Sequence, residues 1–533
     1  MQPNLNNQNK HLSVSPVDPS KLKFWLSGYN LTLKDFLING FTEGFKIPFT
    51  GQREFRISKN LKSATENPLV LQNAIEKEIK TGRAAGPFNS SPFKNFQISP
   101  LGVVPKKEKN EFRVIHHLSH PDGNSINDGI NSIHTSVQYQ TIEDAIRIVA
   151  KFGRGTLMAK TDIEHAFKLI PIHPSDYELL GFQFNGQFYY DKTLPFGLSY
   201  SCQLFEKFSS ALQWIMESHF KVPGCVHVLD DFLYLGPPRS DLCNKSLNYF
   251  LNVCKEIGVP IKAAKTVYPT TCLTFLGLEI DSMAFEIRLP PDKLSKLKNA
   301  ITEALNMRKM TLRQLQSLIG LLNFACIAVT PGRAFLRRII DLTIGLAKLH
   351  FFRRITTDAK DDLRAWALFI ENFNGKGLIL EDKWKSSETL NLYTDASNLG
   401  FGAVFNDQWF YHAWHASWEN YHITIKELFP IVLALEVFAA QIANSKIIFH
   451  SDNLAVVHII NKQTSKDKTI MKLVRRLVVC ILKHNVVFKA CHIPGVLNVA
   501  ADKLSRLQVQ QFVQLYPHMA RNQVKIQENQ LLL

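Results

Sequence analysis

Two adjacent aspartates, Asp230 and Asp231, lie between two short runs rich in β-forming residues, at 227–229 and 232–235. A Gly-Pro-Pro at 236–238 closes the second run, so the stretch predicts a hairpin with the acidic pair at its tip. Adjacent carboxylates repel each other, and a fold that holds both usually has a positive charge between them. Mg²⁺ is one candidate, because it prefers hard oxygen ligands. A solvated Asp-Asp turn is the alternative.

The composition indicates a basic globular protein with a polyanionic partner. The 533 residues allow about two to four domains, and an apolar content of 45% permits sizeable cores. The net charge of +16 favours nucleic acid or an anionic membrane surface. The longest apolar run, at 319–329, is too short to span a bilayer, and no secretory signal is visible, so we expect no membrane partner.

The eight cysteines are scattered without a C-x-x-C pattern. Neither a zinc module nor a disulfide framework is indicated, so we expect an intracellular protein of the cytoplasm, the nucleus or both.

Basic and acidic residues recur at predicted strand ends before the acidic pair. A hairpin over 101–115 has a basic tip, where Lys106 and Arg113 could grip a phosphate, although turn lysines are usually just solvated. A strand from 155 ends in Asp162, where a carboxylate can meet the hairpin tip. The backbone carbonyl of Ile163 would be a further metal ligand.

An aromatic hairpin around Asn-Gly is predicted over 181–190. It leads to a Leu-Pro-Phe-Gly loop at 194–197 and then to a helix. A glycine there lets the backbone approach a flat partner closely, although an ordinary helix start is the alternative.

In this order the motifs resemble those of reverse transcriptases from long-terminal-repeat-type retroelements. The resemblance includes a lysine-bearing loop at 258–265 and a primer-gripping hairpin at 273–280. It implies an α+β multidomain chain with the fingers, palm and thumb of a right-hand polymerase. The helical stretch 290–375 resembles the thumb, where basic helices follow the duplex backbone. A capping box at 311–314 opens one of its helices, and its basic residues include Arg333, Arg337, Arg338, Arg353 and Arg354.

The resemblance also implies a role for each motif residue. Asp162, Asp230 and Asp231 would hold two Mg²⁺ ions, with Mn²⁺ as a substitute, to activate the primer 3′-hydroxyl. The other implied roles are triphosphate binding by Lys106 and Arg113, exclusion of a 2′-hydroxyl by Phe167, contact with nucleotide and template by Phe196 and Gly197, and protonation of pyrophosphate by Lys265. Three positions depart from the family pattern without removing a catalytic group, namely Val228, His117 and Lys262.

A second set of carboxylates follows a Gly/Asn-rich break at 372–377. A strand over 389–395 is predicted to end in Asp395, Glu427 stands near the start of a long apolar helix, and another strand ends in Asp452. This part resembles ribonuclease H, whose four metal positions would be Asp395, Glu427, Asp452 and Asp502, again with two metal ions. His492 matches the histidine linked to product release. A basic helix over 469–483 could grip the hybrid through Lys472, Arg475, Arg476 and Lys483, although solvation is the default for each.

We therefore expect an N-terminal extension (1–80), fingers and palm (81–289), a thumb or connection (290–375), a ribonuclease H domain (386–507) and a frayed tail (508–533). The chain would copy RNA into DNA and degrade the RNA of the hybrid, with an RNA template, a DNA primer, RNA–DNA hybrid and deoxynucleoside triphosphates as partners. The segments 115–121, 125–128 and 450–453 resemble tyrosine-recombinase (DIRS-like) retrotransposons. A domesticated, non-catalytic nucleic-acid-binding protein and a DNA-directed polymerase are the alternatives.

Overall fold

The computed structural model describes residues 14–105, 112–373, 376–378, 385–443, 445–484, 486–495 and 498–531. The chain forms two compact units, Met1–Leu276 and Gly277–Leu533. Among the helices in the described ranges, none is long and apolar enough to cross a membrane. All eight cysteines are free.

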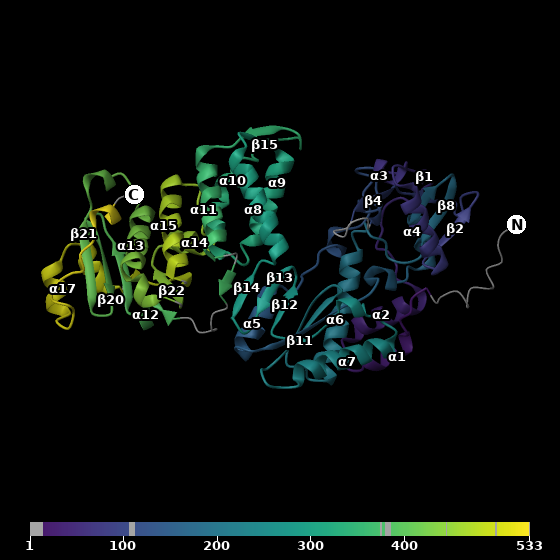
Figure 1. Ribbon diagram of the computed structural model, residues 1–533, viewed down its shortest axis with the longest axis horizontal. Helices are drawn as coiled ribbons and strands as arrows, with labels where there is room; N and C mark the ends of the chain where they lie inside the picture. The colour runs from purple at the N-terminus through teal and green to yellow at the C-terminus, as the bar shows by residue number, and fades with distance from the viewer. Residues whose placement is uncertain are drawn as a thin grey trace. The chain divides into compact units, whose positions relative to one another are not determined.

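The acidic pair lies at one end of a four-stranded antiparallel sheet in the first unit. The strand order is β11-β6-β10-β9, and helices α5, α6 and α7 pack against the sheet (Figure 1). The predicted hairpin over 227–235 and the strand ending in Asp162 are both confirmed. The bounds are β6 (Leu157–Asp162), β9 (Cys225–Val228), β10 (Asp231–Gly236), β11 (Val267–Thr270), α5 (Ile142–Phe152), α6 (Ser201–His219) and α7 (Leu242–Ile257).

A five-stranded sheet of order β1-β3-β7-β8-β2 forms the rest of the unit, together with the hairpin β4–β5. Asn185 and Gly186 adopt positive φ values of 50° and 76° between β7 and β8, as a tight hairpin turn requires. Both hairpins agree with the sequence expectation. The bounds are β1 (Arg56–Ile57), β2 (Ala84–Phe88), β3 (Gln97–Ile98), β4 (Leu101–Pro105), β5 (Phe112–His116), β7 (Gly181–Phe184) and β8 (Gln187–Asp191).

The segment before residue 81 differs from the expected extension, because its described part belongs to the core of the first unit. Helices α1 (Pro19–Trp25) and α2 (Leu31–Glu43) bury Leu22, Leu37 and Phe41 among the side chains of α6 and α7. The next two helices, α3 (Lys62–Thr65) and α4 (Pro68–Lys80), pack on a second apolar cluster with β2 and β4. This segment is therefore integral to the fold.

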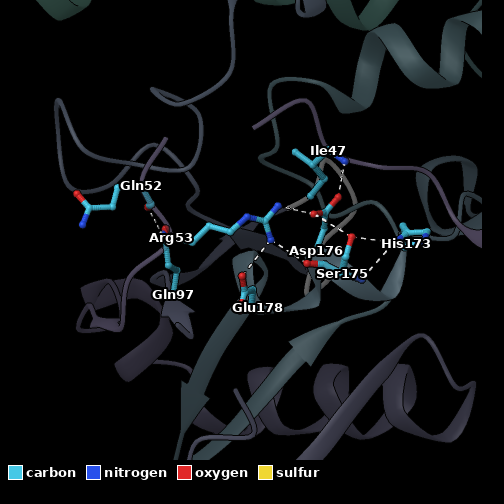
Figure 2. A network of polar contacts seen from close by, with 8 residues as sticks. All are labelled: Ile47, Gln52, Arg53, Gln97, His173, Ser175, Asp176 and Glu178. Atoms are coloured by element: carbon cyan, nitrogen blue, oxygen red, sulfur yellow. Dashed lines mark hydrogen bonds and ion pairs between the residues drawn. The ribbon is translucent and has the colours of Figure 1, made fainter. Parts of the chain in front are cut away.

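An ion-pair network around buried Asp176 holds residues before 81 to the short helix η4 (Pro174–Leu179). Arg53 pairs with Asp176 at 2.6 Å and with Glu178 at 3.0 Å, and the backbone N–H of Ile47 donates to the other Asp176 oxygen at 2.7 Å (Figure 2). Both carboxylate oxygens of this buried aspartate are thus satisfied, as a buried charge requires.

In the second unit, a helical region follows strands β13 and β14, as expected. Thr311 and Gln314 form the predicted reciprocal capping box at the start of α9. Two short strands, β15 and β16, pair beside the helices, and a small antiparallel sheet is formed by β13, β14 and β17. The bounds are α8 (Pro291–Asn306), α9 (Leu312–Ala325), α10 (Arg337–Asp341), α11 (Thr357–Phe373), β13 (Leu278–Asp281), β14 (Glu286–Arg288), β15 (Lys309–Thr311), β16 (Phe352–Arg354) and β17 (Lys376–Leu378).

The remainder of this unit is an α/β arrangement. Strands β19-β20-β21 are antiparallel, and β18-β22-β23 are parallel. Helices α13 and α15 pack together (Figure 1), and α16 packs on β19 and β20. The bounds are β18 (Lys385–Ser386), β19 (Leu392–Ala396), β20 (Gly400–Phe405), β21 (Gln408–Ala413), β22 (Lys446–Ser451), β23 (Val487–His492), α12 (Ser387–Leu390), α13 (Ile423–Phe438), α14 (Leu454–Lys462), α15 (Lys468–His484), α16 (Val499–Ser505) and α17 (Val509–Leu515).

Two expectations for this region need correction. The strand predicted from residue 389 begins at Leu392, because Ser386 Oγ accepts the backbone N–H of Thr389 and the intervening residues form α12. The segment after 508 is not frayed over its described residues. Phe512 of α17 is buried against Trp409, whose indole N–H donates to the carbonyl of Ala520 at 2.8 Å.

Candidate active sites

Strand pairing brings the three carboxylates of the first unit together. Asp231 begins β10 and lies opposite Asp162 at the end of β6, while Asp230 occupies the turn between β9 and β10. The backbone N–H of Ile163 donates to the carbonyl of Asp230 at 3.0 Å, which ties the end of β6 to the turn. The predicted grouping of these three acids is thus seen in the fold.

The turn is held through the residue before the acidic pair. Leu229 has a φ of 54°, in the left-handed region that side chains other than glycine rarely occupy. Its backbone N–H donates to Glu206 of α6 at 2.9 Å, and its carbonyl accepts Ser209 Oγ at 2.7 Å. The other oxygen of Glu206 lies 3.1 Å from His227 Nε2. Glu206 and Ser209 of helix α6 therefore fix the conformation of the turn.

The electrostatics of this site favour a cation. Burial, together with the neighbouring charges of Asp231 and Asp162, raises the pKa of Asp230 to about 6. Burial also raises the pKa of Asp231. Lys265 Nζ lies 2.5 Å from Asp162 Oδ2, and this hydrogen bond raises the pKa of the lysine. The positive charge of Lys265 thus offsets part of the negative charge of the three carboxylates, whose ionised forms are made unfavourable by burial.

A cavity of about 770 Å³ opens beside the carboxylates and gathers most of the predicted nucleotide-binding side chains. The guanidinium of Arg113 lies 5.0 Å from the ring centre of Phe196, and Phe167 lies 5.3 Å from the same ring. Gly197 has a φ of 122°, and an added Cβ would lie 2.0 Å from the carbonyl oxygen of His116. Only glycine fits there, as the motif implies. Lys106 lies outside the described residues.

The four predicted carboxylates of the second unit also converge. Asp395 lies on β19, Glu427 is in the second turn of α13, Asp452 follows β22, and Asp502 is on α16. Burial raises the pKa of Asp395 to about 6 and that of Glu427 to about 9. The charges of Asp502 and Asp452 also raise the pKa of Asp395, and those of Asp395 and Asp452 also raise the pKa of Glu427. The four side chains therefore share one electrostatic environment.

Local contacts orient these acids. Ser505 Oγ donates to Asp395, Arg506 Nε pairs with Asp502 at 2.7 Å, and His492 Nε2 lies 3.1 Å from the backbone carbonyl of Asp452. His492 is exposed at the end of β23. It thus borders the acidic group without being buried in it, and its link to product release stays a prediction.

The donor chemistry at both sites suits Mg²⁺, although the side chains are not arranged around an ion. Within the described ranges, no three Asp, Glu, His or Cys side chains converge closely enough to hold a metal. Lys265 pairs with Asp162 in the first group, and Arg506 pairs with Asp502 in the second. A bound cation would have to displace these contacts, and it would relieve the repulsion that raises the pKa of Asp230 and Glu427.

Several basic residues that were expected on nucleic-acid-binding faces are paired within the protein. Arg475 pairs with buried Asp362 at 3.2 Å, and Arg476 pairs with Glu436 at 2.7 Å. These two guanidinium groups are therefore ion-paired and not simply solvated, whereas Lys472 and Lys483 on the same helix are exposed. In the helical region, ion pairs or carbonyl contacts likewise occupy Arg337, Arg338 and Arg353.

The sequence reasoning missed the residues that support the sites. Glu206 and Asp191 are buried acids with polar partners, the first within α6 and the second at the end of an aromatic strand. Each acid follows an aromatic residue but precedes a lysine, so the sequence carried no clear signal that either acid is buried.

Two families match the sequence. Residues 104–280 match the family described as "Reverse transcriptase (RNA-dependent DNA polymerase)", and residues 385–478 match "RNase H-like domain found in reverse transcriptase". The chain carries a reverse transcriptase domain and an RNase H-like domain. The first matched region contains Asp162, Asp230 and Asp231, and the second contains Asp395, Glu427 and Asp452.

Viral and retrotransposon polyproteins are similar to this chain. The enzymatic polyprotein of Carnation etched ring virus is 23% identical over 60% of the chain and 46% of its own length. The Pro-Pol polyprotein of Feline foamy virus is 26% identical over 45% of the chain and 21% of its own length. The chain spans only 8% of the genome polyprotein of Petunia vein clearing virus, with which it is 24% identical.

Solved structures share the fold of the chain. The foamy viral protease–reverse transcriptase in complex with dsDNA is 18% identical, with a TM-score of 0.50 over 90% of this chain and 98% of that one. A second structure of that protein with double-stranded DNA has a TM-score of 0.51 at 17% identity, over 89% of this chain and 82% of that one. The expected α+β fold, a polymerase followed by an RNase H-like domain, is confirmed.

Proposed function

We propose that the chain is an RNA-directed DNA polymerase with ribonuclease H activity, which copies retroelement RNA into DNA and degrades the RNA of the hybrid. One observation carries the proposal. Asp231 lies opposite Asp162 across paired strands, with Asp230 in the adjoining turn, inside the region that matches reverse transcriptases. An intracellular location stays a prediction from cysteine usage.

The acids of each domain would hold Mg²⁺, or Mn²⁺ in its place. Asp162, Asp230, Asp231 and the Ile163 carbonyl would bind it in the polymerase domain, and Asp395, Glu427, Asp452 and Asp502 in the RNase H-like domain. When bound, two such ions supply activation of the attacking oxygen and neutralise charge on the leaving group. Lys265, released from Asp162, would be free to donate a proton to pyrophosphate.

Side chains around the cavity would select and orient a deoxynucleoside triphosphate. Arg113 would neutralise the triphosphate, and Lys106 would join it there. Phe167, wedged between Phe196 and Phe205 at 5.3 and 5.7 Å, would exclude a 2′-hydroxyl. Phe196 and Gly197 would border the nucleotide and the template, because the glycine permits close approach of the backbone.

The RNase H-like domain favours an RNA template over a DNA template, because hydrolysis of a hybrid is useful only where RNA has been copied. A domesticated, non-catalytic nucleic-acid-binding protein is the alternative, and the presence of all seven carboxylates argues against it. We further propose that the element is of the DIRS-like type, on the segments 115–121, 125–128 and 450–453.

A reciprocal pair of variants tests the function. We expect the wild-type chain to extend a DNA primer on poly(rA) with Mg²⁺ and to cleave the RNA of a hybrid. Asp230→Asn/Asp231→Asn should lower extension by about a thousandfold or more and spare cleavage, while Asp452→Asn should do the reverse. Hybrid binding serves as the folding control for both variants. Equal, poor extension by wild type and the Asp230→Asn/Asp231→Asn variant, with binding intact, would rule out the polymerase. Loss of both activities in either variant would contradict two independent sites.

A further inference from the structure

Asp191, at the end of β8, is the centre of a buried polar network in the wall of the nucleotide cavity. Its Oδ1 accepts Lys168 Nζ at 2.9 Å, and its Oδ2 lies 3.1 Å from His116 Nδ1. The other ring nitrogen of His116 faces the carbonyl of Gly181 at 3.0 Å. The side chains of Asp191, Lys168 and His116 are only 9%, 13% and 3% exposed. Each polar group of the network therefore has a partner.

Each arm of this network leads to an element that carries a nucleotide-binding motif. Lys168 directly follows Phe167 in the short helix η3 (Ala166–Leu169). His116 lies on β5, the strand of Arg113, and its backbone N–H donates to the carbonyl of Phe196 at 3.0 Å. Three segments that are distant in sequence thus meet at one carboxylate.

The ion pair to Lys168 adds a charged contact to the packing and hydrogen bonding that hold η3, in which Ser15 Oγ donates to the carbonyl of Leu169. The helix has four residues and starts after His165, which adopts a left-handed conformation with a φ of 60°. A single turn of this kind is not held by its own hydrogen bonds. Besides the packing of Phe167 and Leu169, its attachment to β8 is the Lys168–Asp191 contact.

We propose that Asp191 is a positioning residue for sugar discrimination, which holds η3 so that the Phe167 ring stays against Phe196. The proposal rests on the polymerase function proposed above. A small displacement of Phe167 would open the space that a 2′-hydroxyl needs, while the metal-binding carboxylates on β6 and β10 would be unaffected. The network would thus act on the choice of sugar and not on the chemical step.

The test compares incorporation of a deoxynucleotide and the matching ribonucleotide by the full chain. We expect Lys168→Met, which keeps the side-chain length but removes the charge, to lower the ratio of the two kcat/KM values by about tenfold. The change should come from a lower KM for the ribonucleotide, with kcat for the deoxynucleotide nearly unchanged. Phe167→Ala gives the upper limit of lost discrimination.

Arg53→Met is the matched control. It also replaces a cation that faces a buried aspartate of the first unit, Asp176, but it lies outside the cavity lining (Figure 2). It should lower the melting temperature and leave the discrimination ratio at the wild-type value. A reduced ratio in Arg53→Met would mean that any loss of stability relaxes the site, and would overturn the proposal.

The double variant Lys168→Met/Asp191→Asn covers the case in which Lys168→Met alone fails to fold, because it leaves neither charge unpaired. It should fold and still discriminate poorly. Wild-type discrimination in both this variant and Lys168→Met would refute the role of Asp191. A wild-type chain that extends no primer would instead refute the polymerase function, so the two failures are distinguishable.

Discussion

Leu229 shows how one residue can set the geometry of a site without touching its chemistry. Its left-handed backbone costs a residue with a side chain roughly 1–2 kcal/mol relative to the ordinary conformation. Hydrogen bonds to Glu206 and Ser209 hold it there. The strain is stored beside the acidic pair and is balanced by contacts from α6, a common arrangement at functional sites.

Removing the contact from Glu206 should therefore damage the turn specifically. We expect Glu206→Ala to lower kcat for primer extension by about tenfold, because Asp230 and Asp231 lose their fixed direction. Adding Leu229→Gly should restore part of that activity, since glycine adopts positive φ without cost. Ser210→Ala on the same helix is the control and should match wild type. A double variant no more active than Glu206→Ala would contradict this role of Leu229.

The sequence predicted the carboxylates but not the residues that orient them. Asp162, Asp395 and Asp452 each follow a β-forming run, so their place at strand ends was visible in the pattern. The left-handed backbone conformation of Leu229 and the hydrogen-bond partners of Glu206 depend on packing between α6 and the sheet. Such contacts join residues about twenty positions apart and leave no periodic signal.

At the scale of elements, α15 shows that a basic helix need not be a nucleic-acid-binding face. The predicted apolar face is buried as expected, with Leu473, Val474 and Leu477 inaccessible. Two of the four basic side chains, however, face neighbouring helices of the same unit. Periodicity correctly gave the buried face, but it could not show that α11 and α13 supply acids beside it.

Two substitutions on α15 separate these roles. Arg475→Met should destabilise the second unit by about 3 kcal/mol, because Asp362 is left buried with a weaker set of partners. Lys472→Met, on an exposed position of the same helix, should leave thermal stability unchanged and weaken hybrid binding at low salt. Chemical denaturation and salt-dependent binding measure the two effects. Equal loss of affinity in both variants would restore the interpretation in which Arg475 grips the hybrid.

At the scale of the whole molecule, the two compact units each carry a set of mutually repelling carboxylates. Order along the chain, from polymerase motifs to RNase H-like motifs, was predictable because every motif is local in sequence. The integration of residues 14–80 into the first core was not, because α1 and α2 pack on helices more than 150 residues away.

Magnesium should stabilise both units. A metal present at a hundred times its dissociation constant adds about 2.7 kcal/mol to the free energy of unfolding. This raises the melting temperature of a unit of this size by several degrees. Scanning calorimetry of the metal-free chain should show both transitions move upward on adding Mg²⁺. Asp230→Asn/Asp231→Asn should abolish the shift of one transition only. Unchanged transitions in the wild-type chain would contradict metal binding at these acids.

The segment at 520–524 has a consequence for the behaviour of many molecules together. Ala520 donates its N–H to the carbonyl of Asp407 at 2.7 Å, and Val524 donates to that of Trp409 at 2.8 Å, so the segment runs along β21, the outermost strand of its sheet. A bare outermost strand invites strand addition by another chain and hence aggregation. By occupying carbonyls along that edge, the segment leaves less of the strand open to pairing with a second molecule at high protein concentration.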